Sequence, residues 1–322
     1  MITKIFTLFF ALFSGFVLAA GSAHDHLPPA SEKLTKIEGV KAEGVATVLE
    51  GAFGWLPFPV TNSMVMTIIA GVLLIVLFRL AASNLKAIPS GAQNFGEFVV
   101  GSLYDFLETI MGKHLTKRTF WFLGSVFFLI LISNWLGLVP GVGTIGLQAK
   151  EAASELVVDY PGASHDNFRP FLRGANADQN VTFAMSITFM LLWLYWSFTE
   201  VGFKGFLEHI FAPKGKFSGF MLAFMWLIFM IVGVIEVVSI SIRPLTLALR
   251  LYGNIYAGEN LLETLLVGAE GNFLLQVLGP MPFYFMELMV GMIQAFVFTL
   301  LCAIFIKLMC EHHDDEHEEA HH

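Results

Sequence analysis

The chain has 322 residues, of which 56% are hydrophobic and 14% are charged, whereas an average soluble domain has about 25% charged residues. This balance excludes an ordinary soluble protein and indicates an integral membrane protein. The net charge of -8 argues against a nucleic-acid partner. Two cysteines, Cys302 and Cys310, are too few for a disulfide framework.

Residues 1–23 are predicted to be a signal peptide, because a lysine at Lys4 precedes an apolar stretch and small residues near Ala23. An uncleaved anchor is the alternative, although the apolar stretch is shorter than the ~20 residues that a membrane span needs. Residues 24–60 are polar and are predicted to form an external segment. An exported N-terminus favours a bacterial protein.

Five apolar stretches within residues 61–309 predict an all-α integral membrane domain. The predicted spans are Asn62–Ala82, Thr119–Val142, Val181–Thr199, Phe217–Val267 and Phe273–Met309. A helix of about 50 residues extends ~75 Å, against a hydrocarbon core of ~30 Å. We therefore expect the last two helices to be long and tilted, with a break near Pro244 as the alternative for the fourth.

Apolar residues recur at helical spacing from Phe95 to Ile110, between acidic ones, and predict an interfacial amphipathic helix. The loops containing Arg79 to Arg118 and Lys204 to Lys216 are basic, which predicts that they are cytoplasmic. With an exported N-terminus, five crossings place the C-terminus inside as well. Residues 310–322 are acidic with five histidines, and a solvated cytoplasmic tail explains them better than a metal site does.

The fourth span contains charges that an apolar helix rarely carries. Glu236, Arg243 and Arg250 are each seven residues apart, so they share one helical face, and Asn254 joins it four residues later. Glu259 follows Arg250 by nine residues, which places it about 180° round the helix. A charge near the bilayer centre costs ~2.5–3.5 kcal/mol on insertion scales and usually marks an ion pathway. For Glu236 and Arg243, mutual pairing or snorkelling is an equally good interpretation.

The fifth span adds Glu287 and Gln294, which are seven residues apart and share a face. The short link at residues 268–272 makes the last two helices antiparallel neighbours, so we expect Glu259 and Glu287 to share one proton route. Which of the two acids is the last relay stays open.

The run from Arg243 to Glu259, RPLTLALRLYGNIYAGE, resembles the signature of subunit a of F-type ATP synthases, and so does QAFVF from Gln294. The resemblance extends from about Pro57 to Lys307. It implies a static membrane subunit beside a rotating ring of c subunits, with a b-subunit stalk as a further partner. It also implies two steeply tilted C-terminal helices and aqueous half-channels that open to opposite sides of the bilayer.

In that family an essential arginine lies between the half-channels, and Arg250 matches it. The resemblance implies proton-access roles for Asn254, Glu259 and Gln294, and weaker roles for Glu236 and Asn134. Many members carry a histidine at the position of Glu287 or of Glu259, whereas this chain has glutamate at both.

The sequence contains no phosphate-binding loop and no recognisable nucleophile–base pair, so we expect no catalysis, cofactor or metal of its own. The expected cargo is H⁺, and Na⁺ stays open because the ring's binding site largely decides the ion. A proton-coupled secondary transporter is the alternative, but it would favour internal repeats, which are absent from this sequence. A third possible function is that of a membrane scaffold, in which the buried charges only fix the register of the helices.

Overall fold

The computed structural model describes residues 61–82, 91–139, 142, 145–149, 154–158, 168–170, 172–211, 220–268 and 278–310. Within them, five helices are long and apolar enough to cross a membrane, which confirms the predicted all-α membrane class. They are α3 (Asn62–Ala81), α4 (Ala92–Gly137), α5 (Gln179–Glu200), α7 (Phe220–Gly268) and α9 (Met281–Cys310). The predicted signal peptide, the external segment 24–60 and the tail after Cys310 lie outside the described residues.

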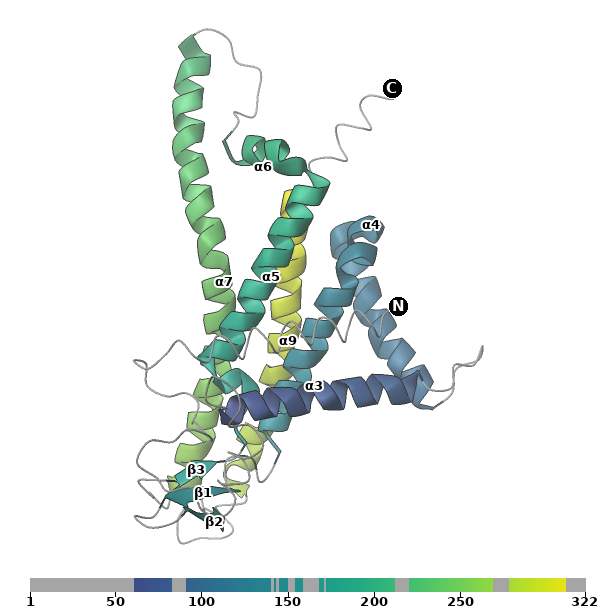
Figure 1. Ribbon diagram of the computed structural model, residues 1–322, viewed down its shortest axis with the longest axis vertical. Coiled ribbons are helices and arrows are strands. Elements are labelled where there is room, and N and C mark those ends of the chain that lie inside the picture. Colours follow the sequence, from purple (N-terminus) through teal and green to yellow (C-terminus); the bar gives the residue numbers. More distant parts are fainter. Residues whose placement is uncertain are drawn as a thin grey trace.

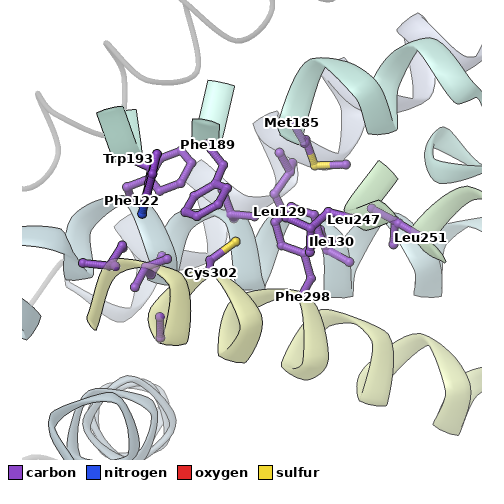
Figure 2. Close-up of a cluster of buried hydrophobic side chains, with 14 of the residues drawn as sticks. Phe122, Leu129, Ile130, Met185, Phe189, Trp193, Leu247, Leu251, Phe298 and Cys302 are labelled. Atoms are coloured by element: carbon purple, nitrogen blue, oxygen red, sulfur yellow. The ribbon is translucent and has the colours of Figure 1, made fainter. Parts of the chain in front are cut away.

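The helix α9 packs against α4, α5 and α7, and α5 packs against α7, while α3 crosses this group beside α4 (Figure 1). The helices α7 and α9 run in opposite directions, as predicted, but α9 begins at Met281 after a turn at residues 279–280 and not at Phe273, so the predicted start of the fifth span was wrong. Their shared core is built from large apolar side chains of all four helices (Figure 2). The labelled members are Phe122, Leu129, Ile130, Met185, Phe189, Trp193, Leu247, Leu251, Phe298 and Cys302.

The helix α4 consists of two helices joined at Gly112, which has φ 78° and ψ 163°. A side chain at this positive φ would strain the backbone, so glycine allows the chain to turn here. The first half contains the predicted helix from Phe95 to Ile110, and Phe95 and Phe98 are each 70% exposed. The second half begins before Thr119 and ends at Gly137, so the predicted bounds of this span were wrong. An apolar stretch indicates only the part of a helix that lipid covers. The helix itself can begin earlier, in polar residues, as it does here before Thr119.

The long helix α7 runs without interruption through Pro244, so the break that was the alternative for this span does not occur. Proline has no N–H, which leaves the carbonyl of Ile240 without its helical donor. Nearby hydroxyl groups bond back to the same helix: Ser241 Oγ donates to the carbonyl of Val237 at 2.8 Å. The Thr246 hydroxyl likewise bonds to the carbonyl of Arg243 at 2.8 Å, so both hydroxyls bond carbonyls other than the freed one.

The segment between α4 and α5 contains three short antiparallel strands in the order β2-β1-β3, which the search for long apolar stretches did not predict. Their bounds are β1 (Ile145–Ala149), β2 (Ser154–Val158) and β3 (Phe168–Pro170). A short helix, η1 (Ala175–Ala177), follows and is fully buried. Asp178 then caps α5, because its Oδ1 accepts from the N–H of Asn180 at 2.9 Å. A further unpredicted helix, α6 (Gly202–Phe211), connects α5 to the segment before α7.

Candidate functional site

Arg250 is exposed on α7, although its neighbours Leu247 and Leu251 are buried in the core. Within the described part of the chain, its guanidinium makes no hydrogen bond or ion pair. Arginine stays protonated in proteins, so this is a permanent positive charge. No contact among the described residues uses this charge, so the guanidinium is available to bind a group outside the chain.

Four residues further along α7, Asn254 contacts α9. Its Nδ2 donates to Oε1 of Gln294 at 2.7 Å. The Gln294 side chain is 4% exposed, and its Nε2 has no hydrogen-bond partner among the described residues. The two amides predicted from the sequence therefore meet directly, between the helices and close to Arg250.

Asn134 of α4 reaches α9 from another side. Its Nδ2 donates to the carbonyl of Gly291 at 3.0 Å, and its Oδ1 accepts from Nδ2 of Asn176 at 2.6 Å. A Cβ at position 291 would lie 3.0 Å from the Cβ of Asn134, so glycine permits this approach. The contact fixes α9 between Glu287 and Gln294. Asn176, in η1, is a partner that the sequence analysis did not identify.

Glu287 is 5% exposed and lies against Gly258 of α7, where an added Cβ would overlap its carboxyl group. Its Oε1 has no hydrogen-bond partner among the described residues. The group interacts electrostatically with Glu259, the next residue after that glycine. The structure thus brings together the two acids that we expected to be neighbours.

Glu259 is held by Arg173, which precedes η1. The Arg173 Nε lies 3.2 Å from Oε1 and 3.4 Å from Oε2 of Glu259, and a terminal guanidinium nitrogen lies 3.1 Å from Oε2. Arg173 was not among the site residues predicted from the sequence. No local pattern could find this pair, because its members are 86 residues apart in the chain.

Glu236 is not brought to these residues. It lies fourteen residues before Arg250 on the same helix, about 21 Å along the axis. Its charge acts instead on Arg243, whose guanidinium carbon lies 4.6 Å from the ring centroid of Phe305 and 5.9 Å from that of Trp193. Cation–π contact explains why a half-buried Arg243 is tolerated between helices.

We expect Gly258→Ala to lower proton movement through this site. The added Cβ would displace the Glu287 carboxyl group, and overpacking of this kind costs ~1–3 kcal/mol. Passive proton conduction in membrane vesicles would measure the loss. Gly253→Ala is the matched control, since its Cβ would meet nothing within 4 Å and should leave conduction unchanged. Equal conduction in both variants would contradict the close contact at Gly258.

A family model described as ATP synthase A chain matches residues 64–307. The ATP synthase subunit a of Solidesulfovibrio magneticus is 31% identical over 253 residues, covering 79% of this chain and 86% of the relative. That of Gloeobacter violaceus is 29% identical, covering 80% and 86%. The sodium ion specific subunit a of Propionigenium modestum is 29% identical, covering 80% and 77%. The chain, with its five apolar helices and its line of polar groups between α7 and α9, belongs to the ATP synthase A chain family.

Proposed function

We propose that this chain is the proton-translocating stator subunit of an F-type ATP synthase. Membership of the ATP synthase A chain family makes it a multi-pass membrane subunit of that complex. In the proposal its partners are the rotating ring of c subunits, the b-subunit stalk and the lipid bilayer. It performs no ATP chemistry itself, and supplies two half-channels with a fixed positive charge between them.

The observation that carries the proposal is Arg250, which is unpaired among the described residues and lies on a helix whose other exposed side chains are mostly apolar. A ring carboxylate that has lost its proton is attracted to this cation, because opposite charges a few ångströms apart interact strongly at low dielectric. The same cation repels protons, so they cannot cross directly from one half-channel to the other. A proton must therefore travel on the ring.

Behind Arg250 lies a succession of polar side chains that can pass a proton between α7 and α9. It contains Asn254, Gln294, Glu287 and Glu259, and Asn134 supports it from α4. Two of these groups, Gln294 Nε2 and Glu287 Oε1, keep hydrogen-bonding capacity that no described residue uses. In the proposal this succession belongs to the half-channel at the α4–α5 connection, which the basic-residue rule places outside the cytoplasm.

The proposed location is the bacterial inner membrane, with the N-terminus outside after signal-peptide removal and the C-terminus in the cytoplasm. The proposed ion is H⁺. The relative from Propionigenium modestum is named as sodium ion specific, so Na⁺ is the other ion to include in a transport assay.

Reconstitution in liposomes tests the function. We expect a membrane sector that contains this chain and its ring to conduct protons under a potassium-diffusion potential, whereas the chain alone conducts none. A proton-coupled secondary transporter would act without the ring. Proton uptake by the chain alone, at the rate of the complete sector, would therefore contradict the stator proposal.

A further inference from the structure

We propose that Arg173 is a positioning residue of the proton pathway: its guanidinium holds the Glu259 carboxylate and supplies the countercharge for the Glu259–Glu287 pair. The inference rests on the proposed function, and it assigns a role to a residue outside the two C-terminal helices.

The first support is geometric. Both oxygens of Glu259 are engaged by the fork of Arg173, at 3.1 to 3.4 Å. A planar guanidinium that meets both carboxylate oxygens fixes direction as well as distance, which a single ammonium contact does not. The side chains are 19% and 37% exposed, respectively, so water screens this pair less than it screens an ion pair on an open surface.

The second support is the rigidity of the segment that carries Arg173. The four residues from Ala175 to Asp178 are at most 3% exposed. Asn176 bonds to Asn134, and a Cβ at Gly137 of α4 would lie 3.3 Å from the Gly174 backbone. Arg173 therefore projects from a fixed base between α4 and α5 toward α7, and its position is coupled to the Asn134 contact with α9.

The third support is the balance of charge. Glu259 and Glu287 interact with each other electrostatically, and two acids this close repel when both are ionised. Among the described residues, Arg173 is the cation that pairs with either acid, while Arg250 pairs with neither. Arg250 also lies nine residues from Glu259, roughly 13 Å along the helix. The permanent charge of Arg173 thus allows two acids to lie close together, and leaves Arg250 to a moving partner.

Five variants of the complete complex test this role in vesicles, with passive proton conduction normalised to the amount of chain in the membrane. We expect Arg173→Gln to lower conduction at least about tenfold, and Arg173→Lys, which keeps the charge but lacks the planar fork, to lose less than Arg173→Gln and still conduct below wild type. The double variant Arg173→Gln/Glu259→Gln should equal Glu259→Gln alone, because neither variant has a Glu259 carboxylate for Arg173 to hold and a single remaining acid forms no repelling pair. Arg169→Gln, in β3, is the control for loss of a cation from the same connection.

A merely structural Arg173 would give a different result, since its loss would lower conduction by the same factor with or without the Glu259 charge. That outcome, or wild-type conduction in Arg173→Gln, overturns the inference. If Arg173→Gln alone does not accumulate, the comparison of the double variant with Glu259→Gln decides in the same way. A wild-type complex that conducts no protons would instead contradict the proposed function, so the two failures are distinguishable.

Discussion

Arg250→Ala is expected to reduce proton-driven ATP synthesis to background while the chain still inserts and assembles. The side chain is exposed and has no partner among the described residues, so its removal costs the fold little. What it removes is the fixed charge that separates the half-channels in the proposed mechanism. The rate of ATP synthesis in inverted vesicles measures the loss of function, and an immunoblot of the chain in the same vesicles measures its insertion.

Two further variants sharpen this test. Arg250→Lys should fail as well, because a compact ammonium lacks the planar fork of the guanidinium. Leu249→Ala shortens the neighbouring side chain, which is 43% exposed, and should retain most of the synthesis. Synthesis at the wild-type rate in Arg250→Ala would remove the central element of the mechanism.

The second large effect is expected from the double variant Glu259→Gln/Glu287→Gln. Each single change should slow passive proton conduction only in part, since one acid remains in the route and Arg173 remains beside it. Without both acids, neither carboxyl group of this pair remains in the route. Conduction should then fall far below the product of the two single effects, because neighbours in one network are not additive.

The measurement is passive conduction through the membrane sector in all three variants. The matched control is Glu236→Gln, since Glu236 lies apart from this route and its charge acts on Arg243. If the double variant equals the product of the single variants, the two acids act independently. A loss in Glu236→Gln as large as that in the double variant would show a general effect of charge on assembly.

The sequence predicted the parts of the molecule that depend on local pattern. Long apolar stretches located the five helices, and seven-residue spacing placed Glu287 and Gln294 on one face of α9. A short link between α7 and α9 was enough to predict that the faces would meet, and Asn254 does bond to Gln294. Helix bounds were less predictable, as at Gly137, because hydrogen bonding rather than apolarity ends a helix.

The parts that local pattern missed depend on long-range contact. Arg173 lies in a polar connection and meets Glu259 across 86 residues of chain, so neither spacing nor composition indicates the pair. Asn176 is missed for the same reason: only the folded η1 brings it to Asn134. The short strands between α4 and α5 are neither long nor strongly apolar, and an expectation built on membrane spans had no means to predict them.

The exposed, mostly aliphatic side of α7 has a mechanical consequence for a partner that moves along it. Between Val234 and Ile242 the exposed side chains are mostly aliphatic, and the Ser241 hydroxyl bonds back to its own helix. A hydrogen bond to a sliding surface would hold at each step with a net ~0.5–1.5 kcal/mol, whereas each pair of carbon atoms in contact is worth only ~0.1–0.2 kcal/mol and has no preferred direction. In the proposed mechanism such a face would exchange one contact for the next with little resistance as the ring turns past it.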